Sequence, residues 1–259
     1  MNIVVLVKQV PDSGSVRNLD PADNTVARAT ADNVINELDE YAIEEALTLK
    51  EAAGGEVTIL TVGPDSATDA IRKALSMGAD RAVHVCDEAI HGSDALATSA
   101  ILAAALSQLE YDLILCGAEA TDSQMSVMPA LLAERLGIAQ LSGARKLTVE
   151  GGVAKVERQT DGGYWALEAP LPAIVSTWDT INEPRYPSFK GIMAAKKKPV
   201  ERKSLADLGI DPATVGLGAA TTQVLDFAGR PPKGQGVKVV DEGDGAQKLV
   251  DFLASQKIV

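Results

Sequence analysis

Residues 57–86 read VTILTVGPDSATDAIRKALSMGADRAVHVC, and this stretch predicts a strand, a helix and a second strand in turn. The two apolar runs, 57–62 and 82–86, are short and almost continuous, which is typical of strands buried on both faces of a parallel sheet. Between them, residues 66–77 place their apolar side chains on one face of a helix, and Gly78 is suited to end it. The stretch therefore indicates a strand–helix–strand unit of an α/β fold.

The same alternation extends in both directions along the chain. Further strand-like runs lie at 3–7 and 113–116, and further helical segments lie at 38–51, 94–109 and 127–136. A different pattern follows, in which glycine turns separate short segments that favour antiparallel strands. These segments are 147–149, 153–158 and 164–167, and a last buried strand is expected at 173–177. We therefore expect a Rossmann-like α/β fold with a mostly parallel sheet and helices on both faces.

The C-terminal part of the chain has a different composition. Large apolar residues become sparse after residue 203, and residues 229–236 are rich in glycine, proline and lysine, as in a linker. Residues 245–256 then form one more amphipathic helical pattern. We expect an α/β domain over residues 1–203 and a C-terminal arm over 204–259. By pattern alone, the arm can dock either on its own domain or on another subunit.

Composition excludes several classes of partner. The chain has 259 residues and a formal net charge of −12, which repels nucleic acids and anionic lipid surfaces. No apolar run approaches the length of a membrane span, and the N-terminus lacks the pattern of a secretory signal. The two cysteines do not form a disulfide framework, so we expect a cytoplasmic protein without membrane insertion.

Conventional catalytic motifs are missing from the sequence. The only histidines are His84, within a strand-like run, and His91, before a helix, and their positions favour ordinary packed and solvated roles. No nucleophile elbow, Walker A sequence or metal-ligand spacing occurs. A hydrolase, a kinase and a metal site are therefore disfavoured.

The strongest candidate site lies where the predicted strands end. Lys8 follows the first strand, Gly63 the second, and the small polar loop 117–126 follows the fourth and opens a helix. Ligands of open α/β sheets bind outside these carboxyl ends, and a helix N-terminus attracts phosphate. The alternative is a plain capped helix, in which Asp122, Ser123 or Ser126 satisfies its own first turn.

Several segments together resemble the beta subunit of electron transfer flavoprotein. They are VVLVKQVPD at 4–12, NELDEYAIEEA at 36–46, IRKALSMGADRAVHV at 71–85 and NEPRYPSFKGIMAAKKK at 182–198. The last is the most specific because of its length. The resemblance covers most of the chain.

The resemblance implies an electron carrier rather than an enzyme. Such a subunit forms a heterodimer with an alpha subunit, which holds most of the FAD site, and itself holds AMP as a structural nucleotide. The pair carries electrons from acyl-CoA or other flavin dehydrogenases, as in fatty acid beta-oxidation, toward a membrane quinone oxidoreductase. The arm at 204–259 is then expected to dock on the alpha subunit.

The resemblance also assigns residues to the nucleotide. The matching positions are Leu6, Lys8, Asn36, Glu37, Leu38, Asp39, Val62, Ala120, Thr121, Asp122, Ser123, Gln124, Met125, Ser126 and Val127. Many relatives carry glycines in the last stretch, where this chain has Ser123 and Ser126, and a Cβ disfavours positive φ. The loop also lacks the longer pattern of relatives that bind a second FAD, so AMP is favoured.

Residues 182–198 resemble the partner-recognition loop of the family. Phe189 stands where the usual apolar anchor is a leucine, and an aromatic anchor suits an interface hot spot. The alternative is a Phe189 side chain tucked against its own loop. The expected contact residues are Tyr186, Phe189, Ile192, Met193, Lys196, Lys197 and Lys198.

Two other functions fit an α/β scaffold of this kind. One is a nucleotide-responsive protein that binds AMP or ATP as a signal and carries no electrons. The other is an adenylating enzyme, which would need a phosphate-gripping motif that the sequence lacks.

Overall fold

Strand β1 (Asn2–Leu6) lies at the centre of the sheet and pairs in parallel with β4 (Glu56–Val62) and β6 (Leu113–Gly117). Its side chains alternate between two hydrophobic clusters, with Ile3 in one and Val4 in the other. Both are almost fully buried, and complete burial of such a side chain stabilises the fold by about 1.5–3 kcal/mol. The near-continuous apolar runs of the sequence reflect this burial on both faces.

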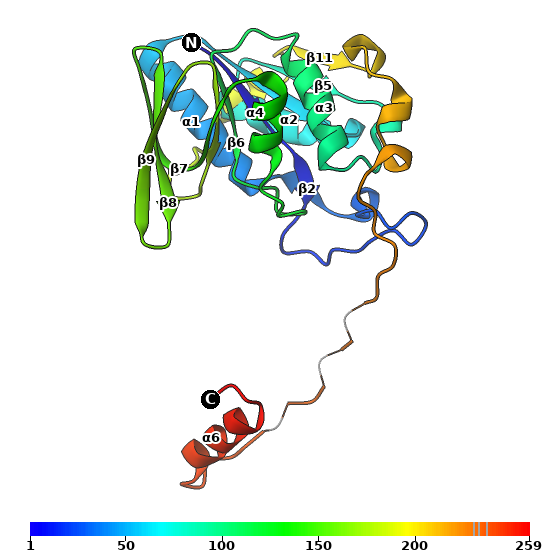
Figure 1. The fold of residues 1–259 in the computed structure, drawn as a ribbon, viewed down its shortest axis with the longest axis vertical. Coiled ribbons are helices and arrows are strands. Elements are labelled where there is room, and N and C mark those ends of the chain that lie inside the picture. Colours follow the sequence, from blue (N-terminus) through cyan, green and yellow to red (C-terminus); the bar gives the residue numbers. More distant parts are fainter. Residues whose placement is uncertain (230, 233, 237) are drawn as a thin grey trace. The chain divides into compact units, whose positions relative to one another are not determined.

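The computed structural model describes every residue except 230, 233 and 237. Within the described residues, nine strands form one sheet in the order β11-β5-β4-β1-β6-β10-β7-β8-β9 (Figure 1). The strands from β11 to β7 run parallel, and β7, β8 and β9 are antiparallel. The remaining strands of the sheet are β5 (Arg81–Val85), β7 (Ala139–Glu150), β8 (Val153–Thr160), β9 (Gly163–Pro170), β10 (Ala173–Thr177) and β11 (Val200–Lys203).

Helices cover both faces of the parallel part of the sheet. Helices α1 (Glu37–Ala53) and α2 (Thr68–Met77) bury Ile43 and Ile71 in one cluster. Helices α3 (Ala95–Leu106) and α4 (Met128–Leu136) contribute to the other cluster through their own apolar faces. Gly78, with φ of 146°, follows the last residue of α2, as the sequence predicts. The Rossmann-like α/β fold is confirmed.

Four features differ from the sequence-based expectation. Strand β7 begins at Ala139 instead of residue 147, because its first residues pair in parallel with β10. Strand β11 adds a parallel edge beside β5. A separate antiparallel pair, β2 (Gln9–Pro11) with β3 (Asn33–Ile35), brackets the loop between them. A short helix, α5 (Phe189–Ala195), lies within the segment expected to be a loop.

The chain divides into two compact units, Met1–Leu225 and Asp226–Val259. The division falls later than the boundary expected after residue 203, because Leu205, Leu208 and Val215 are buried in the core of the first unit. The second unit contains helix α6 (Gly245–Ser255). The expected linker 229–236 includes residues that lie outside the described part of the chain. None of the helices described is long and apolar enough to cross a bilayer.

Candidate functional site

Asp39 joins the ends of the two central strands. Its Oδ2 accepts a hydrogen bond from the backbone N–H of Lys8, just after β1, at 2.8 Å, and its Oδ1 accepts one from Gly117, at the end of β6, at 3.2 Å. Strand order reverses between β1 and β6, because the chain first builds β4 and β5 on one side and then crosses to the other. Ligands of open α/β sheets bind at such a switch point.

Asn36 connects helix α1 to the loop after β6. Its Nδ2 donates to Asp39 Oδ1 at 3.0 Å and to the carbonyl of Glu119 at 2.9 Å, and its Oδ1 accepts from the backbone N–H of Thr121 at 3.0 Å. Asn36 and Asp39 are both buried. Burial raises the pKa of Asp39 to about 6, although the hydrogen bonds from Lys8, Asn36 and Gly117 oppose that rise.

Asp122 lies between two cations. Lys8 Nζ is 2.6 Å from its Oδ1, Arg28 pairs with its Oδ2, and the Asp122 side chain is 0% exposed. Burial alone would raise the pKa of Asp122, but the charges and hydrogen bonds of Lys8 and Arg28 hold it below its usual value. Burial lowers the pKa of Lys8, and Asp122 opposes that fall. With all three groups ionised, the cluster carries a single net positive charge.

The loop before α4 has an unusual backbone conformation. Gln124 and Ser126 adopt φ of 50° and 54°, which is the left-handed region that non-glycine residues seldom enter. No side chain caps α4, because Asp122 pairs with the two cations and Ser126 Oγ donates to Glu119 Oε2 at 2.8 Å. The alternative in which Asp122, Ser123 or Ser126 caps this helix is therefore wrong. The Thr121 hydroxyl is buried and has no hydrogen-bond partner among the described residues.

Parts of this site suit the phosphate of a nucleotide. A helix N-terminus suits a phosphate, and no side chain caps the start of α4, although Pro129 in its first turn supplies no N–H. The cations Lys8 and Arg28 pair with Asp122 in the loop that precedes this helix. The Thr121 hydroxyl is a further polar group that no described residue engages, and its oxygen is buried. The proposed fit of a phosphate to this site rests on the uncapped start of α4 and on the Thr121 hydroxyl.

The structure brings together part of the set assigned from the sequence. Lys8, Asn36, Asp39 and the segment 119–122 form one hydrogen-bonded group. Leu6, the last residue of β1, is buried in the core. Val62, the last residue of β4, and Leu38, in the first turn of α1, are half-buried. The more solvent-exposed members are Glu37, Ser123, Gln124, Met125 and Ser126, and Val127 is half-buried.

Sequence reasoning missed two residues of this site and named a third, Gly117, only as the start of the candidate loop. Arg28 pairs with Asp122, and Arg17 Nη1 donates to the carbonyl of Thr121 at 2.5 Å. Both lie in the loop between β2 and β3, about which the sequence carries no motif. At Gly117 a Cβ would approach Asp39 Oδ1 to 2.7 Å, so glycine is required there. The position of Gly117 at a strand end is the one signal that pointed to it.

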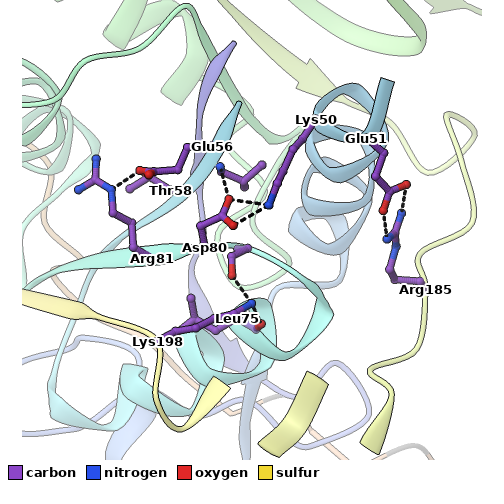
Figure 2. Close-up of polar contacts among 11 residues, drawn as sticks. Lys50, Glu51, Glu56, Thr58, Leu75, Asp80, Arg81, Arg185 and Lys198 are labelled. Carbon is purple, nitrogen blue, oxygen red and sulfur yellow. Dashed lines mark hydrogen bonds and ion pairs between the residues drawn. The ribbon is translucent and has the colours of Figure 1, made fainter. Parts of the chain in front are cut away.

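A second surface is formed by residues 182–198, which we call the docking loop. It exposes the side chains of Tyr186, Phe189, Ile192 and Met193, with Tyr186 95% and Phe189 81% exposed. Phe189 is therefore not tucked against its own loop. Lys196 and Lys197 are also exposed. Figure 2 shows Lys198 turned instead toward the carbonyl of Leu75, and Arg185 paired with Glu51.

Other chemistry-bearing residues have structural partners. His84 is buried and its Nε2 lies 3.1 Å from the carbonyl of Gly63, and His91 pairs with Asp23 at 2.7 Å. Cys116 is buried and Cys86 is half-buried, and both are free thiols. Across the part of the chain that the structure describes, no three His, Cys, Asp or Glu side chains gather as a metal site would require.

Known proteins match this chain along its whole length. Residues 23–208 match the family described as electron transfer flavoprotein domain. The chain is 51% identical over 264 residues to the electron transfer flavoprotein subunit beta of Mycobacterium leprae, a match that covers 100% of this chain and 99% of the relative. It is 37% identical over 271 residues to the subunit of that name from Megasphaera elsdenii, with both chains fully covered.

A relative with a different name matches equally completely. The caffeyl-CoA reductase–Etf complex subunit CarD of Acetobacterium woodii is 35% identical over 263 residues and is covered over 100% of both chains. The family match and the full-length relatives agree with each other and with the Rossmann-like sheet. The chain therefore belongs to the electron transfer flavoprotein family, as a beta subunit, and it is an electron transfer protein.

Proposed function

We propose that this chain is the beta subunit of a heterodimer in which it binds AMP and completes the FAD site of an alpha subunit. The heterodimer accepts electrons from acyl-CoA or other flavin dehydrogenases, as in fatty acid beta-oxidation, and passes them toward a membrane quinone oxidoreductase. The observation that carries the proposal is the cluster of donors and cations between β1 and β6 in a member of this family.

AMP is the nucleotide that the cluster suits best. The uncapped start of α4, together with the positive charges of Lys8 and Arg28, would hold the phosphate. Asp122 would repel a phosphate if it stood alone, but two cations neutralise it. Thr121 would donate its free hydroxyl. One phosphate group matches a single net positive charge better than a longer polyphosphate does.

The flavin is proposed to be held chiefly by the alpha subunit, and when bound it supplies reversible acceptance of electrons. The role of this chain is to bind the adenylate, to support the companion subunit and to exclude water from their contact. Its free thiols, Cys86 and Cys116, suit the reducing cytoplasm, which is where we propose that the heterodimer acts.

The docking loop is proposed to be the surface that meets the dehydrogenases. Its exposed apolar side chains would enter an apolar pocket of the partner, and the neighbouring Lys196 and Lys197 would speed encounter with an acidic rim. Charge steering of this kind matters on a chain of net charge −12, because the rest of its surface would repel an acidic partner.

Identification of the bound nucleotide tests the proposal. The chain is co-expressed with the alpha subunit, the purified heterodimer is boiled, and the released nucleotides are separated by chromatography. We expect equimolar AMP and FAD. Stoichiometric ATP without flavin would contradict the proposal and would favour a nucleotide-responsive binding protein. Pyrophosphate exchange above background would instead indicate an adenylating enzyme.

A further inference from the structure

The docking loop is tied to helix α1 at its start. Asn182 Nδ2 donates to the carbonyl of Tyr41 at 3.0 Å and to Glu45 Oε2 at 3.1 Å. Arg185 then makes a larger set of contacts with Glu44 and Glu51. Glu44 and Glu51 are seven residues apart, which is two helical turns, so both carboxylates face the same side of α1.

The Arg185 guanidinium is used as a fork. Its Nε and Nη2 donate to the two oxygens of Glu44 at 2.8 and 2.9 Å, and its Nη1 donates to Glu51 Oε1 at 2.5 Å. Its backbone N–H donates to Glu44 Oε2 at 3.0 Å. Burial would raise the pKa of Glu44, but Arg185 outweighs burial and holds that pKa below its usual value. Only a planar fork can satisfy both carboxylates in this way.

The other end of the docking loop is tied to helix α2. Lys198 Nζ donates to the carbonyl of Leu75, in the last turn of α2, at 2.9 Å and to that of Ala79, just beyond the helix, at 2.5 Å (Figure 2). A Cβ at Gly191 would approach the Ser76 carbonyl oxygen to 2.4 Å, so α5 packs as closely on α2 as glycine permits. Lys198 therefore fixes the end of the loop and does not serve as a free steering charge.

Between the two ties, the loop holds its apolar side chains in solvent. Phe189 and Tyr186 are almost fully exposed, so burial of these side chains does not fix their position. What fixes the backbone that carries them is the polar attachment at Arg185 and Lys198, together with the close packing of α5 on α2. A segment ordered before binding loses less conformational freedom when it docks, and its affinity rises accordingly.

We propose that Arg185 is a positioning residue for docking, which holds Phe189 in the conformation that enters the partner dehydrogenase. This inference rests on the proposed function of the docking loop. It adds that Glu44 and Glu51 of α1 hold the docking loop in place through Arg185. Arg185 acts through Phe189 and does not itself touch the flavin.

The test measures dehydrogenase kinetics with the complete heterodimer as the varied substrate. The medium-chain acyl-CoA dehydrogenase of the source organism, with octanoyl-CoA, reduces the heterodimer, and a dye is the final acceptor. For Arg185→Gln we expect KM for the heterodimer to rise about tenfold, since the loop must be ordered during docking, with kcat and flavin content unchanged. Arg185→Lys keeps the positive charge but lacks the planar guanidinium, so its KM should lie between those of the parent chain and Arg185→Gln. Arg145→Gln is the matched control, because Arg145 is also half-buried and makes a forked pair with Glu157.

A double variant separates positioning from general damage. If Arg185 acts through Phe189, Arg185→Gln should raise KM no further in a chain that already carries Phe189→Ala. Additive effects, or an unchanged KM in Arg185→Gln alone, would overturn the positioning role while leaving the docking role of Phe189 intact. An unchanged KM in Phe189→Ala would overturn both. Should Arg185→Gln fail to fold, Glu51→Gln removes only the exposed carboxylate and carries the same prediction at smaller size.

Discussion

At the start of helix α1, the Asp39 carboxylate accepts hydrogen bonds from the backbone N–H groups of Lys8 and Gly117. Those two groups belong to the ends of β1 and β6, so one side chain fixes the spacing of the strands that flank the nucleotide site. A carboxylate is needed, because an acceptor must face each N–H. The arrangement has a cost, since the charge lies in a fully buried position.

That cost should appear as a dependence of stability on pH. The pKa of Asp39 rises from 3.8 to about 6 through burial, so the folded state holds this proton more tightly than the unfolded chain does. The Asp39 contribution to stability should therefore fall as pH rises from about 4 to above 6, by about 3 kcal/mol in all. Asp39→Asn cannot ionise. We expect the difference in unfolding free energy between the parent chain and this variant to shift by that amount, measured by denaturant titration.

The direction in which the stability difference between the parent and Asp39→Asn changes with pH is the most decisive part of the prediction. The parent should lose stability relative to Asp39→Asn as pH rises. A constant difference between pH 4 and pH 7 would show that the hydrogen bonds from Lys8, Asn36 and Gly117 offset burial completely. A difference that moves the opposite way would show that they outweigh it.

The sequence predicts some residues of the site and not others for a physical reason. Lys8, Asn36 and Asp39 lie directly at strand and helix ends, where local pattern indicates ligand positions. Arg28 pairs with a residue 94 positions away, through a loop that has no periodicity of its own. Long-range ion pairs leave no trace in local spacing, so only the folded chain reveals them.

Among the elements, helix α5 has the clearest external role. It is short, begins at Phe189 with Ser188 as its cap, and buries only Ala195. It contacts α2 on the same face of the sheet as α1, while Leu96 of α3 lies on the opposite face. An apolar helix surface of this kind is expected to be completed by another protein.

Phe189→Ala tests that role. Truncation of an aromatic anchor at an interface typically costs 2 kcal/mol or more, so KM of the dehydrogenase for the heterodimer should rise about 30-fold. Flavin content should not change, because Phe189 lies outside the nucleotide site. Leu96→Ala, an exposed apolar residue on the other face, is the control and should leave KM unchanged. A loss of bound flavin in Phe189→Ala would show that α5 supports the cofactor instead.

The strand segments of the main sheet that sequence reasoning missed are β11, at its edge, and the first part of β7, between β10 and β8. Residues Val200–Lys203 of β11 carry three charged side chains, which protect an edge strand but hide its β pattern. The first part of β7 contains Gly143 at φ of 69°, and the register with β10 shifts beside it. Central strands were predicted within about one residue, because burial on both faces imposes an unbroken apolar run.

At the scale of the whole molecule, the division after Leu225 separates the α/β unit from Asp226–Val259. Helix α6 in the second unit exposes Leu249, Val250 and Phe252. No described residue of α6 is buried, so its apolar stripe has yet to be covered. Residues 204–225 belong with the first unit, so the proposed arm is confined to the residues beyond them.

Removal of residues 229–259 should separate folding from assembly. All the described residues of the two core clusters lie in the first unit, so the truncated chain should keep its circular dichroism spectrum and its melting temperature. It should fail to co-purify with the alpha subunit, because the apolar stripe of α6 is gone. If the truncated chain still assembles with the alpha subunit, residues 229–259 are not the arm that binds it. If the truncated chain is unfolded, the first unit does not fold on its own.

The central claim is that this chain binds an adenylate and presents a docking loop while the alpha subunit holds the flavin. Electron transfer through the assembled heterodimer tests this claim most directly. The chain and the alpha subunit are purified together, and the yellow absorbance band is followed after a catalytic amount of acyl-CoA dehydrogenase and its substrate are added. We predict a yellow complex that is bleached at a rate dependent on the docking loop. A complex that is colourless and cannot be made yellow by added FAD would contradict it.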